Sequence, residues 1–341
     1  MGRVVVIGTG GTISMVQDPA RGGAVPTLDG RSLVAELAKA ELEFVEHCKL
    51  PSAQFTLDDI WSIRNRVREL VARSDVTGVV VSQGTDALEE VAYLLDITVE
   101  GEKPMVLTGA MRTASQVGWE GAANLMASIR VASDAQARGL GALVVLNDEV
   151  HAARYVTKTH TQSVDTFKSL GWGPLGRVDG DRVVIGQRVE RDLIPCEALG
   201  GTVSLIKLVV GMDDGLLRYV VEAGASGVVL EVFGGGRVPP AWMDAIRQAI
   251  SEGVAVVATS RCPAGRLYDS YGFEGAYRDL ADAGVLFAGD LNGPKARIRL
   301  MAALDASYRL GVPLNSFFEQ RNYRRKLVRV TPCRPRRSCR A

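Results

Sequence analysis

Short runs of consecutive apolar residues, rich in valine and isoleucine, alternate along the chain with stretches whose apolar residues recur every three or four positions. The runs are continuous rather than alternately apolar and polar, which is typical of parallel strands covered on both faces. They predict eight strands, at residues 3–7, 78–82, 104–108, 142–146, 203–208, 227–232, 254–259 and 285–288. Because helical periodicity lies between them, we predict α/β layers with right-handed crossovers.

Two of the predicted helices have clear ends. One begins at Pro240, since proline suits the first helical position, and stops before Gly253, which suits a C-terminal cap. Its apolar residues share one face: Trp242, Ile246, Ala249 and Ile250. The other occupies residues 119–137 and ends at Arg138-Gly139.

The alternation breaks between residues 178 and 201. Asp179-Gly180-Asp181 predicts a hairpin turn, and polar residues follow up to Gly200-Gly201. We place a linker at residues 191–201, after a larger N-terminal α/β domain with a mostly parallel sheet at residues 1–190. A smaller C-terminal domain with a parallel, flavodoxin-like sheet of four strand–helix repeats then covers residues 202–320.

Charge divides the chain less evenly than its total suggests. The 341 residues carry 40 Lys and Arg against 39 Asp and Glu, and 47% are hydrophobic, which excludes a wholly disordered chain. No stretch of about 18 uncharged apolar residues predicts a membrane span. Residues 321–341 hold nine basic residues and no acid, which leaves a net charge of −8 for residues 1–320. This tail indicates either contact with nucleic acid or an acidic surface, or, as we favour, a disordered extension.

The cysteines signal neither a metal site nor a disulfide framework. They are odd in number, widely spaced and free of any C-x-x-C pattern: Cys48, Cys196, Cys262, Cys333 and Cys339. The apolar run after Met1-Gly2-Arg3 is too short for a signal peptide. We therefore predict a cytoplasmic protein with free thiols.

Candidate chemistry lies where the strands end, because ligands of open α/β sheets collect beyond the carboxyl ends of strands. The first strand leads into Gly8-Thr9-Gly10-Gly11-Thr12-Ile13-Ser14. A phosphate loop is disfavoured there, since neither G-x-G-x-x-G nor Gly-Lys-Ser/Thr spacing exists. The simplest interpretation is a tight turn that carries a threonine.

The second strand ends in Ser82-Gln83-Gly84-Thr85-Asp86. Asp86 and Glu89 fit a capping box for a helix with an apolar face formed by Leu88, Val91, Leu94 and Leu95. Thr85 then lies just outside a helix N-terminus, where backbone N–H groups can hold an oxyanion or a carboxylate.

The third strand ends in Thr108-Gly109-Ala110, and the fourth leads toward Thr157-Lys158-Thr159. A lysine between threonines is ordinarily a solvated helix face. His47, His151 and His160 have poor spacing for a metal, and no Gly-x-Ser-x-Gly elbow exists, so we predict no metal and no Ser-His-Asp hydrolase. A threonine nucleophile assisted by a lysine stays open.

These segments, in this order, resemble the bacterial-type L-asparaginase/glutaminase family across residues 3–310. The resemblance rests on five segments: Gly10-Gly11-Thr12-Ile13, Gly84-Thr85-Asp86 with Glu89-Glu90, residues 103–112, Val156-Thr157-Lys158-Thr159, and residues 265–297 with Leu291-Asn292-Gly293-Pro294-Lys295. It implies a larger and a smaller α/β domain, and a homotetramer or homodimer whose active sites are shared between neighbours. It implies no cofactor and a small amino-acid amide as substrate.

The resemblance also implies a reaction and its residues. A side-chain amide, as in L-asparagine, is hydrolysed to a carboxylate and ammonia through an acyl-threonine. Thr12 is the implied nucleophile, with Thr85, Asp86 and Lys158 as the second catalytic group and Asp86 also as the ligand of the substrate's α-ammonium. Ser52 or Gln54 falls near the substrate-carboxylate loop, and backbone N–H groups near Gly11 and Ala110 are the expected oxyanion donors.

Three departures from the family pattern concern the neighbouring groups. The loop at residues 16–26 lacks the tyrosine that activates the nucleophile in many members, so Tyr268 or Tyr271 is a candidate replacement. Glu274 is the candidate acid from the neighbouring subunit, and Gly234-Gly235-Gly236 stands where many members have a polar side chain. The alternatives are a glutaminase or related amide hydrolase, and a non-catalytic amino-acid-binding protein. Because some relatives act on aminoacyl-tRNA, the basic tail is the expected site of any nucleic-acid contact.

Overall fold

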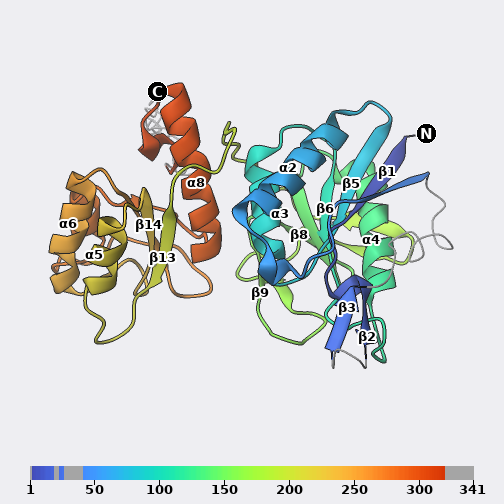
Figure 1. Cartoon of the computed structure of the whole chain (residues 1–341), viewed down its shortest axis with the longest axis horizontal. Helices are drawn as coiled ribbons and strands as arrows, with labels where there is room; N and C mark the ends of the chain where they lie inside the picture. The colour runs from blue at the N-terminus through green and yellow to red at the C-terminus, as the bar shows by residue number, and fades with distance from the viewer. Residues whose placement is uncertain (1, 19–22, 27–40, 319–341) are drawn as a thin grey trace, which may run out of the picture.

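The computed structural model describes residues 2–18, 23–26 and 41–318, which form two α/β units (Figure 1). Residues 186–202, which contain neither helix nor strand, connect the units. The larger unit, blue to green, holds the N-terminal half of the chain, and the smaller unit, yellow to red, holds the rest (Figure 1). The predicted tail at residues 321–341 lies outside the described residues.

The larger unit is built on an eight-stranded sheet of order β12-β11-β8-β7-β6-β5-β1-β4. The five strands from β4 to β7 are parallel, while β8, β11 and β12 extend the sheet in antiparallel fashion. The strands are β1 (Arg3–Gly8), β4 (Leu42–Glu46), β5 (Val76–Ser82), β6 (Met105–Thr108), β7 (Ala142–Leu146), β8 (Glu149–Ala152), β11 (Gly176–Asp179) and β12 (Arg182–Ile185). The predicted mostly parallel sheet is confirmed, and so is the turn at Gly180, where φ is 62°.

Helices cover both faces of this sheet, which explains the continuous apolar runs. Val4 and Val6 pack toward α4 (Gly121–Ser133), while Val5 and Ile7 pack toward α2 (Leu57–Ala72) and α3 (Leu88–Thr98). The predicted helix at residues 119–137 is α4 followed by the 3-10 turn Ala135–Ala137. Two small antiparallel pairs lie outside the main sheet: β2 (Met15–Asp18) with β3 (Gly23–Pro26), and β9 (Val156–Lys158) with β10 (Phe167–Ser169). Further 3-10 turns occupy Thr12–Ser14 and Ser52–Gln54.

The smaller unit has four parallel strands, as predicted. Their order is β13-β14-β15-β16 rather than the 2-1-3-4-5 of a flavodoxin sheet. The elements are β13 (Val203–Lys207), α5 (Gly215–Glu222), β14 (Gly227–Val232), α6 (Met243–Ser251), β15 (Ala255–Ser260), α7 (Tyr277–Asp282), β16 (Leu286–Phe287) and α8 (Gly293–Leu310), with 3-10 turns at Pro240–Trp242 and Leu314–Phe317. The predicted helix from Pro240 is confirmed: Gly253, at φ 84°, follows its end.

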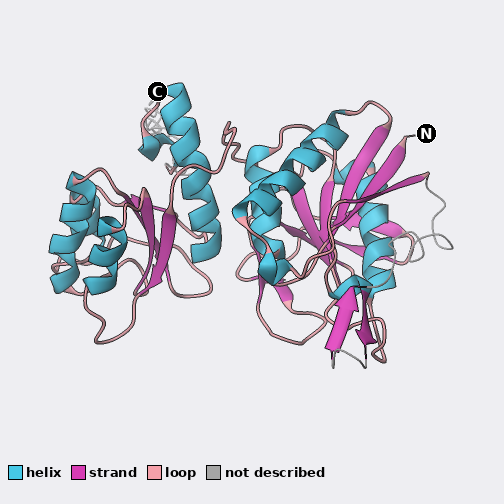
Figure 2. Cartoon of the chain, viewed as in Figure 1, coloured by secondary structure: helices cyan, strands magenta, loops and turns pink. Residues whose placement is uncertain are grey.

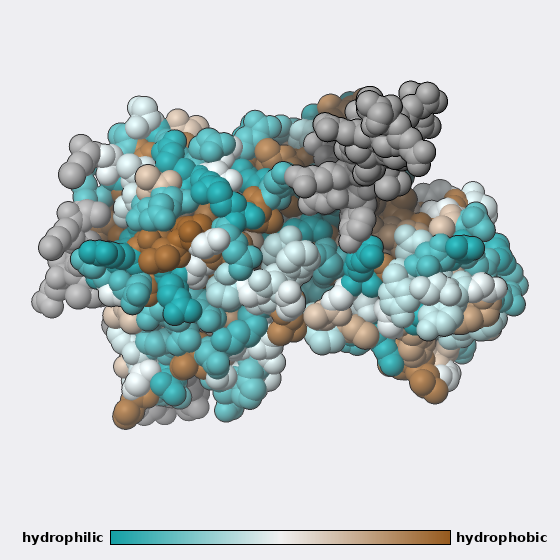
Figure 3. Space-filling view, turned by 180° about the vertical axis from the view of Figure 1, so that it is seen from behind, coloured by the Kyte–Doolittle hydropathy of each residue, from teal (hydrophilic) through white to brown (hydrophobic). Residues whose placement is uncertain are grey.

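Helix α8 joins the two units. It covers one face of the smaller sheet, α5 and α6 cover the other, and α8 faces α3 of the larger unit (Figures 1 and 2). Its buried residues Ile298 and Met301 belong to the same core as Val91 and Leu95 of α3. The view from behind shows mostly hydrophilic residues, with apolar residues in scattered groups (Figure 3). None of the described helices is long and apolar enough to cross a membrane.

Lys295, in the first turn of α8, is a buried charge at this junction. Its side chain is 2% exposed, and its Nζ donates to the carbonyl oxygens of Val156 and, at 3.2 Å, Arg154 in the larger unit. Burial disfavours the ammonium form and lowers the pKa of Lys295 to about 8. Above this pH the folded protein loses a proton that the unfolded chain retains.

We therefore expect the free energy of unfolding to rise with pH because of Lys295. Between pH 7 and 9.5 the stability of the wild-type protein relative to Lys295→Met should increase by roughly 2 kcal/mol, since the unfolded state then binds more protons. Urea unfolding at both pH values measures this difference. Lys49→Met, at a lysine whose side chain is 57% exposed, is the control that should run parallel to wild type. If the free energy of unfolding of Lys295→Met also changed with pH in parallel to wild type, the pH dependence would not come from Lys295.

Candidate active site

Glycine residues allow the loop after β1 to lie directly against the loop after β5. Gly10 and Gly11 have φ of 94° and 86°, which other residues rarely adopt. A Cβ atom at Gly11 would lie 2.2 Å from the backbone nitrogen of Gly84. The absence of a side chain therefore brings Thr12, half-buried in the turn Thr12–Ser14, beside the loop that carries Thr85.

Ser52 packs against the other side of the β5 loop. A Cβ atom at Gly84 would lie 2.7 Å from Ser52 Oγ, and this hydroxyl accepts a hydrogen bond from the backbone N–H of Ala87 at 3.3 Å. The Ser52 side chain is buried, whereas Gln54, two residues later, is exposed. Of the two predicted carboxylate-loop candidates, the structure brings Ser52 to this cluster and leaves Gln54 facing solvent.

Lys158 reaches the same cluster from β9. Its Nζ donates to Thr85 Oγ1 at 2.9 Å and to Asp86 Oδ1 at 2.6 Å. The side chain of Lys158 is 18% exposed and that of Asp86 is 66% exposed, while Thr85 is buried. Three residues that the resemblance groups together are thus in direct contact, although 72 residues separate Asp86 from Lys158 along the chain.

The capping box predicted for Asp86 and Glu89 is wrong. Helix α3 begins at Leu88 with Ala87 as N-cap, and no side chain caps it. Asp86 is instead paired with Lys158, and Glu89 Oε2 accepts the backbone N–H of Lys158 at 2.8 Å. Both carboxylates are drawn away from the helix end by stronger partners on β9. The predicted apolar face of this helix is nevertheless buried.

The loop after β6 completes the cluster. A Cβ atom at Gly109 would lie 2.6 Å from the Gln83 carbonyl oxygen and 3.1 Å from Thr85 Cγ2, so this loop also requires glycine. Asn124 of α4 donates from Nδ2 to the Gly109 carbonyl at 2.9 Å. Ala110 follows, fully buried. The anchoring role of Asn124 was not predicted, since a single asparagine on a helix face carries no distinctive sequence signal.

Glu274 lies apart from these groups, exposed on the loop between β15 and α7. It makes no hydrogen bond or ion pair with any residue that the structure describes. On the same loop Tyr268 Oη accepts a hydrogen bond from Arg237 Nη2 at 3.1 Å, which holds the pKa of Tyr268 below its ordinary value. The Arg237 guanidinium also lies over the Tyr271 ring, 4.2 Å from its centroid.

Tyr268 also explains why Gly235, on the loop after β14, is a glycine. A Cβ atom at Gly235 would lie 2.2 Å from the Tyr268 ring. The tyrosine therefore occupies the space that a side chain at this position would need. The polar side chain that many family members have at this position is therefore absent because Tyr268 fills its place.

A separate cavity of about 490 Å³ lies between the units. Arg154, Arg191 and Arg299 line it, together with Tyr155 and Trp172, and none of the predicted site residues does. The three guanidinium groups are already paired with Asp290, Asp96 and Asp192. Among the described residues, no group of three or more His, Cys, Asp or Glu side chains could hold a metal ion.

Comparison with known proteins identifies the family. Residues 3–191 match the family described as "Asparaginase, N-terminal", and residues 202–310 match the "Glutaminase/Asparaginase C-terminal domain". An L-asparaginase from Bacillus licheniformis is 34% identical over 315 residues, which cover 91% of this chain and 97% of the relative. A probable periplasmic L-asparaginase from Haemophilus influenzae is 33% identical over 88% of both chains. A glutaminase-asparaginase from Pseudomonas fluorescens is 29% identical over 89% of this chain and 86% of its own.

The contact between Gly11 and Gly84 leads to a prediction about stability. Gly11→Ala adds a Cβ atom 2.2 Å from backbone at a φ of 86°, so it should destabilise the protein by about 3 kcal/mol through overpacking and backbone strain together. Gly171→Ala is the matched control, because Gly171 has a similar φ of 79° but open space around it. It should lose only about 1 kcal/mol from strain. Equal losses in urea unfolding would argue against a tight approach of the two loops.

Proposed function

The chain belongs to the glutaminase/asparaginase family, and from that premise we propose that it hydrolyses the side-chain amide of L-asparagine to L-aspartate and ammonia. The observation that carries this proposal is the contact of Lys158 with Thr85 and Asp86, on a loop pressed against the one that holds Thr12. Hydroxyl, amine and carboxylate meet at adjoining strand ends, where a small polar substrate can be enclosed.

Thr12 is the proposed nucleophile. Its Oγ would attack the amide carbon, the C–N bond would break, and the NH2 group would leave as ammonia with the proton given up by the Thr12 hydroxyl, so that the aspartyl group becomes an ester of Thr12. Water would then attack the ester carbon, and the released alkoxide would recover a proton as threonine is restored. The proposed oxyanion donor on the third loop is the backbone N–H of Ala110.

Thr85 and Lys158 are proposed to move the protons of these steps. Because Lys158 Nζ donates to Thr85 Oγ1, the hydroxyl hydrogen of Thr85 is directed away from the lysine. It is therefore available to hydrogen-bond a substrate or a water molecule. Lys158 is itself oriented by Asp86, so the three groups can pass a proton without a change in their mutual contacts.

Substrate orientation is assigned to Asp86 and Ser52. The exposed Asp86 carboxylate would bind the α-ammonium of the substrate. Ser52 Oγ already accepts a hydrogen bond from Ala87, so its own hydrogen can be donated to the α-carboxylate. The exposed side chain of Gln54 is the second candidate for this carboxylate. Glutamine is proposed as an alternative substrate, because a relative bears the name glutaminase-asparaginase.

The activating groups for Thr12 are proposed to come from a neighbouring copy of the chain. Tyr268, Tyr271 and Glu274 all lie on one exposed loop of the smaller unit, where a second subunit could receive them. This proposal requires a homodimer or homotetramer with shared sites. Light scattering would measure the number of subunits. A non-catalytic amino-acid-binding protein is the alternative, favoured by the absence of tyrosine from residues 16–26.

The three cysteines that the structure describes, Cys48, Cys196 and Cys262, are free thiols. This state supports the proposed cytoplasmic location, where disulfides seldom persist. Any contact with nucleic acid is proposed for residues 321–341 alone, on account of their nine basic side chains.

The reaction assignment predicts the behaviour of two alanine variants. Thr12→Ala and Thr85→Ala should each reduce ammonia release from L-asparagine by at least about 10³-fold, because one lacks the nucleophile and the other its proton partner. Thr12→Ser keeps the hydroxyl and should retain measurable turnover. Calorimetry should show aspartate binding by the Thr12→Ala variant. Ammonia release at wild-type rates by both alanine variants would overturn the mechanism, and binding of aspartate by a wild type without turnover would favour the non-catalytic alternative.

A further inference from the structure

Strand β9, which carries Lys158, receives little support from its own sheet. It has three residues, lies outside the main sheet of the larger unit, and among the described strands pairs only with β10, in a two-stranded sheet. Besides Thr85, Asp86 and Glu89 of the larger unit, the start of α8 in the smaller unit makes polar contacts with it. Lys295 Nζ donates to the carbonyl oxygens of Arg154, just before the strand, and Val156, its first residue.

A carboxylate connects the backbone of Lys158 itself to α8. Glu89, which is 9% exposed, accepts the backbone N–H of Lys158 on Oε2 at 2.8 Å. Its other oxygen, Oε1, accepts a hydrogen bond from Asn292 Nδ2, also at 2.8 Å. One buried carboxylate therefore joins residues 158 and 292, which lie in different units.

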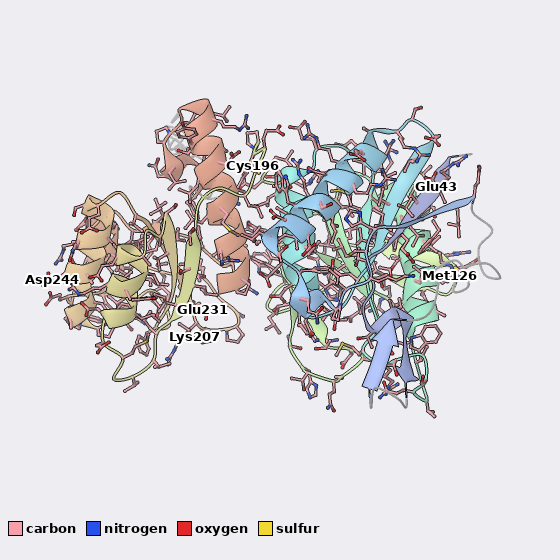
Figure 4. All side chains as sticks on the ribbon, viewed as in Figure 1. Glu43, Met126, Cys196, Lys207, Glu231 and Asp244 are labelled. Atoms are coloured by element: carbon pink, nitrogen blue, oxygen red, sulfur yellow. The ribbon has the colours of Figure 1, made fainter. Side chains whose placement is uncertain are left out.

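The orientation of the Asn292 amide is determined by its second partner. Asn292 is the N-cap of α8, and its Oδ1 accepts the backbone N–H of Lys295 at 3.1 Å. With Oδ1 occupied in this way, Nδ2 must face Glu89. The next residue is fixed as well, because the Gly293 N–H donates to Glu231 Oε1 at 3.2 Å. Figure 4 shows Glu231 beside Lys207 at the ends of β14 and β13, and these two side chains are 3.3 Å apart.

We propose that Asn292 and Glu89 are positioning residues that hold Lys158 in register with Thr85 across the junction of the two units. The proposal rests on the proposed function, in which Lys158 serves proton transfer. Lys158 Nζ lies 2.9 Å from Thr85 Oγ1, so a shift of its backbone by about 1 Å breaks hydrogen-bond geometry, and misplacement on that scale can cost about 10²-fold in rate. The smaller unit thereby contributes to the site of its own chain without touching the substrate.

Exchanging the carboxylate of Glu89 and the amide of Asn292 tests this link. In Asn292→Asp the cap of α8 survives, since aspartate is as good an N-cap as asparagine, but two carboxylates then face each other. In Glu89→Gln one amide must either turn its NH2 group toward the N–H of Lys158 or leave two donors facing at Asn292. In the double variant the introduced glutamine can accept from Lys158 through its amide oxygen, while its NH2 group donates to the introduced aspartate. Donors and acceptors match again.

We expect each single variant to lower kcat for ammonia release by about 10- to 100-fold with a smaller change in KM. The double variant should recover to within about 5-fold of wild type, because the coupling is restored. Thermal unfolding should show the double variant about as stable as the wild type, which separates positioning from loss of the helix cap. A double variant as slow as the product of the two single losses would overturn the proposal.

Glu90→Gln is the matched control for charge. Glu90 is the neighbouring carboxylate, half-buried, and burial, aided by the charge of Glu89, raises the pKa of Glu90. It makes no hydrogen bond with the residues that the structure describes. This variant should keep wild-type kcat, and a loss equal to that of Glu89→Gln would show that negative charge, rather than the link to Asn292, matters.

Hydrogen exchange gives a result that does not depend on turnover. The amide of Lys158 should exchange at least about 10-fold faster in both single variants and return to protection in the double variant. If the wild-type protein released no ammonia, the proposed function would fail, while this exchange pattern would still decide whether Asn292 and Glu89 hold β9. Unchanged exchange in the single variants would overturn the link even in an active enzyme.

Discussion

The site depends on the close approach of backbone to backbone at the carboxyl edge of the larger sheet. Strands β1, β5 and β6 are neighbours in that sheet, so their ends are separated only by the strand spacing of about 5 Å. Loops that leave such ends can meet only where side chains are missing. At Gly11, Gly84 and Gly109 a Cβ atom would lie within 2.2–2.7 Å of the next loop. Thr12 and Thr85 can therefore lie on adjoining turns.

Buried charge is the second constraint, and it acts at the junction of the units. Desolvation penalises Glu89 and Lys295 unless polar partners replace water. Each has such partners, and for both residues they include the backbone of β9. The desolvation of these two groups is thus offset only when β9 and α8 are in place together. The core shared by α3 and α8 supplies the apolar burial that keeps this arrangement closed.

Much of the fold followed from apolar runs, and the exceptions have physical reasons. All eight predicted strands exist, and six of them, β1, β5, β6, β7, β14 and β15, are buried along nearly their whole length. Strand β4 was not predicted, since it is an edge strand with half-buried positions and two glutamates. Strand β8 was also missed, although Asn147-Asp148, at φ of 51° and 58°, forms the two-residue turn of its hairpin with β7. The capping box failed because spacing alone cannot reveal that Lys158 competes for Asp86. The link from Glu89 to Asn292 spans 203 residues, so no local pattern contains it.

Two parts of the smaller unit are attached to the carboxyl edge of its sheet: the start of α8, and the loop that carries Tyr268 and Glu274. The start of α8 is held there, since Thr259 at the end of β15 donates to the Leu291 carbonyl and Glu231 at the end of β14 accepts from Gly293. The loop with Tyr268 and the exposed Glu274 leaves the same edge, directly after β15. That loop therefore begins at the strand edge that also contacts the start of α8, and Lys295 of α8 in turn contacts β9. If a neighbouring copy binds this loop, the contact between subunits and the position of Lys158 both depend on the carboxyl edge of the smaller sheet.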